Sequence, residues 1–107
     1  ADDALKLQSE VSAPNIKLMF DTYHTIYRNE VATDYVHRFG KDLVHIHLAD
    51  SNRLPPGEGT GSFPTLIGTL KKTGFEGYLT MEIGFNRRDV DPDSFAKRAY
   101  DYIKDLL

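Results

Sequence analysis

The sequence predicts an α/β fold in which parallel strands alternate with helices. Three short apolar segments are typical of buried strands, and segments with apolar residues at helical spacing lie before, between and after them. Strands that alternate with helices in this way pair in parallel and are joined by right-handed crossovers. With 107 residues, 40% of them hydrophobic, the chain has material for one domain or a piece of one. We therefore expect the order αβαβαβα.

Helix boundary signals place the first helical regions. A short helix is expected at the amino end, where Asp2 and Asp3 can cap it and favour its start. The segment 25–39 has helical character and is expected to form two pieces, with Thr33 as the cap of the second. Gly40 follows and is expected to end this region, because glycine readily adopts the backbone conformation of a helix C-terminus.

Two later helices show a second kind of start signal. A long loop with three glycines and two prolines leads to Ser62, which together with Pro64 marks the start of a helix that Gly74 ends. Asp91 and Pro92 repeat this signal, and an amphipathic helix is expected to follow them. Loops as long as the one before Ser62 usually have a function.

The three expected strands each have one apolar face and one mixed face. They span 16–22, 43–49 and 78–83. Because side chains alternate along a strand, position alone divides each strand into two sets. The apolar sets are expected to pack against the helices and comprise Leu18, Phe20, Val44, Ile46, Leu48, Leu79, Met81 and Ile83. The mixed sets become ionisable toward the carboxyl ends, where they contain Asp21, His47 and Glu82.

This polar face favours a barrel over an open sheet. Open doubly wound sheets are covered on both faces and show continuous apolar runs, which these strands lack. The carboxyl ends of successive strands carry Asp21, His47 and Glu82, and the inner rim of a (β/α)8 barrel is where such side chains meet. A small sheet with one solvated face is the alternative, although Lys, Thr and Ser are more usual there. We predict a partial (β/α)8 TIM barrel with about three parallel strands and flanking helices.

The ionisable set predicts a metal site. Two carboxylates and one imidazole, from Asp21, His47 and Glu82, suit a hard or borderline divalent ion such as Mg²⁺ or Mn²⁺. Taken singly, these residues have structural interpretations, namely a helix cap, a hydrogen-bonded core histidine and a solvated strand end. Their joint pattern favours a metal site over these separate structural interpretations. His24 and Arg53 follow in loops above the same rim and are candidates for binding substrate oxygens, with ordinary surface polarity as the alternative.

Composition excludes several classes of function. A formal charge of −3 leaves no surplus of positive charge to hold a nucleic acid. The absence of cysteine excludes disulfides, thiolate nucleophiles and cysteine-based metal sites. No apolar run is long enough for a membrane span, so we expect a soluble, cytoplasmic chain. The glycine-rich loop matches neither common phosphate-binding pattern, so a phosphate cradle is not favoured.

Three segments resemble a known family. They are Lys17-Leu-Met-Phe-Asp-Thr-Tyr-His24, Val44-His-Ile-His-Leu-Ala-Asp-Ser-Asn-Arg-Leu-Pro-Pro-Gly-Glu-Gly59 and Gly74-Phe-Glu-Gly-Tyr-Leu-Thr-Met-Glu-Ile83. Their order and spacing resemble the sugar phosphate isomerase/epimerase superfamily of xylose-isomerase-like TIM barrels, and most closely its ketose 3-epimerases of the tagatose and psicose epimerase type. The resemblance spans nearly the whole chain and implies that residues 1–107 are the C-terminal portion of such a barrel.

The resemblance also implies roles for individual residues. In that family two Glu, one Asp and one His hold the metal, and three of these map onto Asp21, His47 and Glu82. The cofactor is then a divalent ion, Mn²⁺, Mg²⁺ or Co²⁺. His24 and Arg53 resemble contacts to the reacting oxygens of the sugar. Glu82 resembles one of two carboxylates that exchange the proton at C3 through a metal-stabilised ene-diolate.

The resulting expectation is a divalent-metal-dependent sugar epimerase that acts at C3 of a ketose. The alternatives are an aldose–ketose or hydroxypyruvate isomerase of the same superfamily, or an inactive half-barrel fragment that self-associates. The last alternative arises because the other family Glu belongs to an earlier strand, which is missing here. Expected partners are a small sugar or sugar phosphate and a second copy or the missing barrel half, with no nucleic acid or membrane. Asp50 resembles an acid of many relatives and is given a supporting role.

Overall fold

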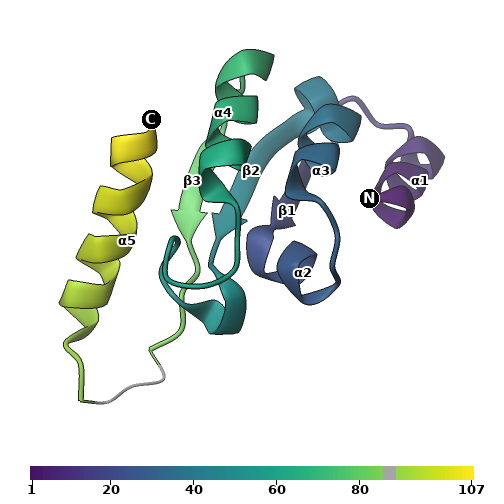
Figure 1. The fold of residues 1–107 in the computed structure, drawn as a ribbon. Helices are drawn as coiled ribbons and strands as arrows, with labels where there is room; N and C mark the ends of the chain where they lie inside the picture. Colours follow the sequence, from purple (N-terminus) through teal and green to yellow (C-terminus); the bar gives the residue numbers. More distant parts are fainter. Residues whose placement is uncertain (86–88) are drawn as a thin grey trace.

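The protein forms a three-stranded parallel sheet with helices beside it (Figure 1). The computed structural model describes residues 1–85 and 89–107. The strands pair in the order β1-β2-β3 and span Leu18–Asp21 (β1), Leu43–Leu48 (β2) and Tyr78–Met81 (β3). The α-helices are α1 (Asp2–Val11), α2 (Thr22–Tyr27), α3 (Ala32–Phe39), α4 (Phe63–Thr73) and α5 (Pro92–Leu106). Two 3-10 turns, η1 (Gly40–Asp42) and η2 (Ser51–Arg53), flank β2. The predicted α/β fold with three parallel strands is confirmed.

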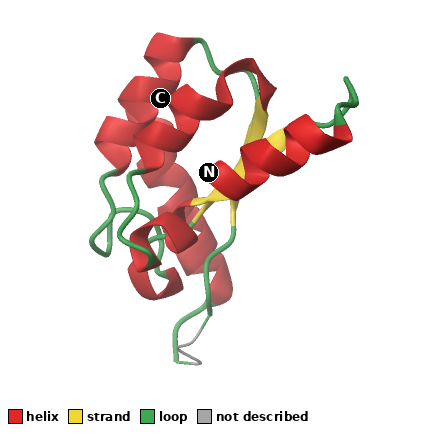
Figure 2. Cartoon of the chain, turned by 90° about the vertical axis from the view of Figure 1, so that its right-hand side faces the viewer, coloured by secondary structure: helices red, strands yellow, loops and turns green. Residues whose placement is uncertain are grey.

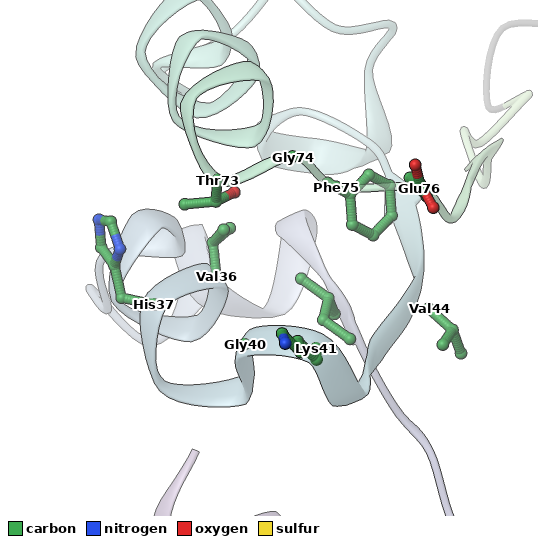
Figure 3. Close-up of a pocket in the computed structure, with 10 residues that line it drawn as sticks. Val36, His37, Gly40, Lys41, Val44, Thr73, Gly74, Phe75 and Glu76 are labelled. Carbon is green, nitrogen blue, oxygen red and sulfur yellow. The ribbon is translucent and has the colours of Figure 1, made fainter.

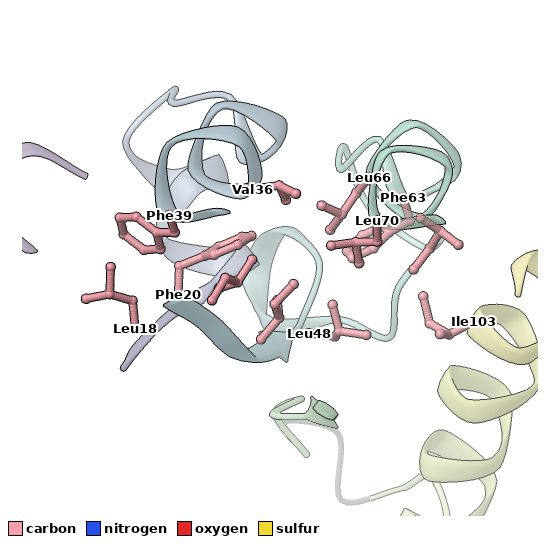
Figure 4. Packing of buried hydrophobic residues seen from close by; sticks show 12 residues of the cluster. Leu18, Phe20, Val36, Phe39, Leu48, Phe63, Leu66, Leu70 and Ile103 are labelled. Carbon is pink, nitrogen blue, oxygen red and sulfur yellow. The ribbon is translucent and has the colours of Figure 1, made fainter. Parts of the chain in front are cut away.

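The hydrophobic core lies between the sheet and helices α3, α4 and α5 (Figure 4). Figure 2 shows the strands as a thin layer with most helices on one side. Each fully buried aliphatic or aromatic side chain in such a core contributes about 1.5–3 kcal/mol. None of the described helices is both long and apolar enough to cross a membrane. The core comprises Leu18, Phe20, Val36, Phe39, Leu43, Ile46, Leu48, Phe63, Leu66, Ile67, Leu70 and Ile103.

The start of β2 departs from the predicted alternation. Val44 was expected on the apolar face, but it is 38% exposed, whereas Leu43 is buried. The pairing with β1 shifts between Leu18↔Leu43 and Met19↔His45, so Val44 is an extra residue on β2. Such an insertion exchanges the faces of the residues on either side of it. The predicted face of Val44 was therefore wrong, while the residues beyond it follow the expected pattern.

Helix α3 begins earlier than predicted. Its N-cap is Val31, which has an extended backbone, and not Thr33. The N–H of Asp34 donates to the carbonyl of Val31 at 3.1 Å, so the first turn closes before Thr33 is reached. The helix ends at Gly40, which is the predicted end. The expected break into two helical pieces is present, since α2 ends at Tyr27.

The two terminal helices begin differently. Helix α1 has Ala1 at its N-cap and no side-chain cap, so Asp2 and Asp3 lie in the first turn instead of capping it. There their negative charges favour the positive end of the helix dipole. Helix α5 is capped as predicted, because the Asp91 carboxylate accepts the N–H of Asp93 at 3.4 Å.

Helix α4 has the predicted boundaries. Ser62 is its N-cap residue, although its hydroxyl donates to Oγ1 of Thr65 at 2.9 Å and makes no bond to the backbone. The helix ends at Gly74, whose φ of 69° lies in the left-handed region that favours glycine.

Strand β3 is shorter than the predicted segment 78–83. It ends at Met81, so Glu82 lies just beyond the strand. The chain nevertheless stays beside β2, because the N–H of Glu82 donates to the carbonyl of Leu48 at 3.0 Å. This bond holds the backbone of Glu82 at the carboxyl end of the sheet.

A candidate metal centre at the carboxyl ends of the strands

Three ionisable side chains from three strand ends come together in the structure. The register pairs Asp21 with His47, and His47 with Thr80. Glu82 follows Thr80 by two residues, so the alternation of side chains keeps it on the same face. One ligand atom from each of Asp21, His47 and Glu82 lies within 4.8 Å of the others. The alternation of side chains along the strands therefore correctly predicted that these three side chains lie close together.

The cluster runs from the protein interior to solvent. Asp21 is only 9% exposed, whereas the side chain of Glu82 is 51% exposed. The Nδ1 atom of His47 lies 3.2 Å from Oε2 of Glu82. Asp21 also caps α2, since its Oδ1 accepts the N–H of Tyr23 at 2.8 Å. Capping leaves Oδ2 of Asp21 for the cluster, so the structural and the site interpretations of this residue are compatible.

Arg53 lies at the centre of the cluster. Its Nη1 donates to Oδ2 of Asp21 at 2.8 Å and to Oε2 of Glu82 at 2.9 Å. Its Nη2 lies 3.3 Å from Nε2 of His24. The guanidinium carbon lies 4.2 Å from the centre of the Tyr23 ring, a cation–π arrangement. The five predicted site residues thus lie together, because Arg53 contacts Asp21, Glu82 and His24, and His47 contacts Glu82.

The backbone around Arg53 is held in an unusual conformation. Asn52 and Arg53 have φ values of 57° and 59°, in the left-handed region that residues other than glycine rarely adopt. Such positions cost on the order of 1–3 kcal/mol and persist only where the surroundings enforce them. Here the carbonyl of Arg53 accepts the N–H of Gly84 at 2.7 Å, which links the loop after β2 to the segment after β3.

Asp50 organises the long loop from which Arg53 projects. The residue is completely buried, and its carboxylate accepts backbone N–H groups at 2.8–2.9 Å. The donors belong to Ser51, Gly57, Gly59 and Gly61. Glycine-rich loops can bind anions through their N–H groups, and in this loop the anion is the protein's own carboxylate. The structure thus gives these glycines a partner that the sequence pattern did not reveal.

Hydrogen bonds and the neighbouring positive charge stabilise the carboxylate of Glu82. Hydrogen bonding involving Asp21 is the largest influence that lowers the pKa of Glu82, and Arg53 and His47 lower it further. Burial acts to lower the pKa of Arg53, but its bonds to Asp21 and Glu82 outweigh burial and raise that pKa above the usual value. Glu82 is therefore a carboxylate at neutral pH, which is the form required of a metal ligand or a base.

Two residues outside the predicted site set lie next to the cluster. Tyr23 provides the aromatic face beneath Arg53. Its position two residues beyond Asp21 was the sequence signal that could have placed it near the site. His45 lies beside His47, with the ring centres 4.9 Å apart, and its Nε2 lies 2.7 Å from Oγ1 of Thr80. His45 is thus a hydrogen-bonded histidine outside the cluster.

A cavity lies at the other end of the sheet (Figure 3). It measures about 620 Å³ and lies where α3 and α4 end and β2 begins. Its lining includes Val36, His37, Leu43, Phe75 and Glu76. In (β/α)8 barrels this amino-terminal end serves stability, and the chemistry takes place at the carboxyl ends. The cluster around Arg53 is therefore the better candidate site.

The comparison with known families agrees with this architecture. Residues 1–106 match the family model described as "Xylose isomerase-like TIM barrel". The chain belongs to this family. Its three strands and flanking helices are accordingly part of a xylose isomerase-like barrel.

Similar proteins of the xylose isomerase-like family include sugar epimerases. D-psicose 3-epimerase from Enterocloster bolteae is 28% identical over 81 residues, which cover 76% of this chain and 27% of that protein. Fructoselysine 3-epimerase from Escherichia coli O157:H7 is 28% identical over 112 residues, which cover 100% of this chain and 40% of that protein. The crystal structure of D-allulose 3-epimerase from Methylomonas sp. superimposes with a TM-score of 0.87 at 25% identity, covering 98% of this chain and 42% of that one. The chain thus spans less than half the length of each.

Proposed function

We propose that this chain is the metal-binding part of a divalent-metal-dependent ketose 3-epimerase. The observation that carries the proposal is the meeting of Asp21, His47 and Glu82 within 4.8 Å at the carboxyl ends of the strands. The 3-epimerases among its relatives support this choice of reaction. The position of residues 1–107 in the C-terminal portion of the barrel stays a prediction.

The donor set fits a divalent metal ion. Carboxylate oxygens and an imidazole nitrogen suit Mn²⁺, Mg²⁺ or Co²⁺ better than a soft metal. The oxygens of Asp21 and Glu82 already bind a cationic group, the guanidinium of Arg53, so the site favours positive charge. When bound, the ion would polarise the substrate carbonyl and so make the proton on the adjacent carbon more acidic.

Glu82 is the proposed acid/base of this chain. Inversion at C3 of a ketose requires that a proton leave one face of the carbon and that another arrive on the opposite face. A carboxylate on each face performs both steps, and Glu82 supplies one of them. Its side chain is half-exposed, and its lowered pKa keeps it in the carboxylate form that can accept a proton. A positioned acid/base of this kind contributes about 10²–10⁴-fold to the rate.

His24 and Arg53 are the proposed contacts to the sugar. The ring of His24 is exposed and lies beside the guanidinium of Arg53, 3.3 Å from Nη2. Both side chains offer hydrogen-bonding groups beside the carboxylates of the cluster, and these groups are proposed to bind the oxygens around C3. The proposed substrate is a small sugar or sugar phosphate, because these groups recognise hydroxyl and carbonyl oxygens.

Proton exchange at C3 tests the proposal. We expect a ketose incubated in D2O with Mn²⁺ and the protein that carries this sequence to gain deuterium at C3, as followed by NMR. Glu82→Gln should reduce this exchange by about 10²–10⁴-fold. Glu76→Gln is the matched control, because Glu76 is an exposed glutamate at the opposite end of the sheet.

Each alternative gives a different result in the same assay. Retained exchange in Glu82→Gln would remove Glu82 from the chemistry. Formation of an aldose without C3 exchange would instead support an aldose–ketose isomerase of the same superfamily. No turnover by a chain that binds metal would support the inactive half-barrel.

A further inference from the structure

One nitrogen atom of Arg53 joins the two carboxylates of the candidate metal centre. Nη1 donates to Oδ2 of Asp21 at 2.8 Å and to Oε2 of Glu82 at 2.9 Å, and it also lies 3.2 Å from the carbonyl oxygen of Glu82. The Glu82 Oε2 atom is the same one that faces Nδ1 of His47. Arg53 therefore binds one oxygen of each of the two carboxylates in the candidate metal centre.

The cluster requires a positive charge even without metal. Asp21 is 9% exposed, and a buried carboxylate without a counter-charge is strongly destabilising. Among the residues that the structure describes, Arg53 is the cation that forms an ion pair with Asp21. Its guanidinium also offsets the mutual repulsion of the two carboxylates.

We propose that Arg53 is a displaceable internal counter-ion, whose guanidinium occupies the ligand oxygens of Asp21 and Glu82 until a divalent metal ion replaces it. This inference rests on the proposed metal-dependent function. A metal ion and a guanidinium compete for the same two oxygens and repel each other, because both are positive. Metal binding therefore moves Nη1 away from at least one of these oxygens.

The displaced side chain has contacts that do not involve the carboxylates. The guanidinium lies over the Tyr23 ring at 4.2 Å, and Nη2 lies 3.3 Å from Nε2 of His24. The backbone of Arg53 is anchored through the bond from Gly84 to its carbonyl oxygen. The side chain thus stays at the site when Nη1 is released, and this nitrogen becomes available to a sugar oxygen. One residue then serves as counter-ion before metal binding and as substrate contact afterwards.

Metal affinity tests the competition directly. Mn²⁺ is titrated into the wild-type chain and into Arg53→Gln, with binding followed by calorimetry. We expect Arg53→Gln to bind Mn²⁺ at least tenfold more tightly, because the competing cation is gone. Arg98→Gln is the matched control, since it removes the same charge from an exposed ion pair with Glu58 and should leave the affinity unchanged. Arg53→Lys should lie between the wild type and Arg53→Gln, because it keeps the charge but loses the planar fork.

Thermal unfolding provides an independent measurement. Without metal, Arg53→Gln should unfold at a lower temperature than the wild type, and saturating Mn²⁺ should remove most of this difference. A purely structural role for Arg53 would lower the unfolding temperature equally with and without Mn²⁺. If Arg53→Gln does not fold without metal, the Arg53→Lys titration still decides between competition and no competition.

The outcomes separate this inference from the proposed function. Equal or weaker Mn²⁺ affinity in Arg53→Gln and Arg53→Lys would overturn the counter-ion inference while leaving the metal centre intact. Absence of Mn²⁺ binding to every variant would overturn the metal centre and the inference together. Tighter binding in Arg53→Gln without any C3 exchange by the wild type would support the inference and reject the epimerase.

Discussion

The carboxylate of Asp50 accepts the backbone N–H of Gly59 at 2.9 Å, across nine residues of the loop that follows β2. Three further N–H groups of the same loop donate to this carboxylate, and Asp50 has no exposed surface. The loop also contains Arg53, so the buried carboxylate fixes the segment from which the guanidinium reaches the site. Loop order and site geometry are therefore coupled through Asp50.

Substitution Asp50→Asn should destabilise the protein by about 1–3 kcal/mol, because the amide nitrogen would face backbone N–H donors and leave them unpaired. The free energy of unfolding measured by urea denaturation checks this. Asp105→Asn changes an exposed aspartate of α5 in the same way and should have little effect. Equal stability of the two variants would show that the loop does not depend on the Asp50 charge.

Gly59 should not tolerate a side chain. A Cβ atom at this position would lie 2.6 Å from Oδ1 of Asp50, and the carboxylate cannot retreat without losing its bonds. We expect Gly59→Ala to lower the free energy of unfolding and the Mn²⁺ affinity. Gly68→Ala is the matched control within α4, where a Cβ meets nothing within 4 Å. That variant should be neutral or more stable by about 0.5–1 kcal/mol, because alanine favours helix interiors. A tolerated Gly59→Ala would contradict the close approach of loop and carboxylate.

Mn²⁺ should stabilise the wild-type chain and not the variant His47→Ala. An ion that binds only the folded state adds about 2.7 kcal/mol at one hundred times its dissociation constant, and this gain is read as a rise in unfolding temperature. His37→Ala, which changes an exposed histidine of α3, should keep the full response. A response that survives in His47→Ala would place the bound Mn²⁺ elsewhere on the protein.

The alternation of side chains was sufficient to predict that three ionisable side chains meet at the carboxyl ends of the strands. Asp21, His47 and Glu82 could be found because parallel pairing and a period of two are regular properties of strands. The extra residue Val44 could not be predicted, since a bulge depends on how two strands pair and not on either sequence alone. The position of the Arg53 guanidinium likewise depends on the left-handed backbone at this residue and on a contact from the distant segment after β3.

The stability of the helical layer should fall at high pH through Tyr35. Burial, followed by the hydrogen bond to Glu30, raises the pKa of Tyr35 to about 12. A raised pKa means that the neutral phenol is favoured in the folded state. The contribution of this neutral phenol to the free energy of unfolding is complete below the ordinary tyrosine pKa of about 10 and is lost between about pH 10 and 12. The unfolding free energy of Tyr35→Phe, compared with that of the wild type, should therefore decline less over this interval. Parallel pH profiles of the two proteins would contradict the assignment.

The sheet face that carries the candidate site should make the chain self-associate. Among the described residues, β1 and β3 each pair with β2 alone, so each has an unpaired edge. Met19 is 42% exposed and Tyr78 is 78% exposed, which leaves apolar surface on the face opposite the core. Unpaired edges beside apolar surface favour association with another chain. We expect sedimentation velocity at micromolar concentration to detect a dimer or larger species.

Variants of that face test the association. Tyr78→Ser should shift the equilibrium toward monomer, because it removes the largest exposed ring of the face. Tyr100→Ser removes an exposed ring from α5, on a different part of the surface, and should leave the equilibrium unchanged. A wild-type chain that stays monomeric across a hundredfold range of concentration would show that water alone is sufficient to cover this face. Dissociation by both variants alike would indicate nonspecific contact between chains, because only one of the two side chains lies on the sheet.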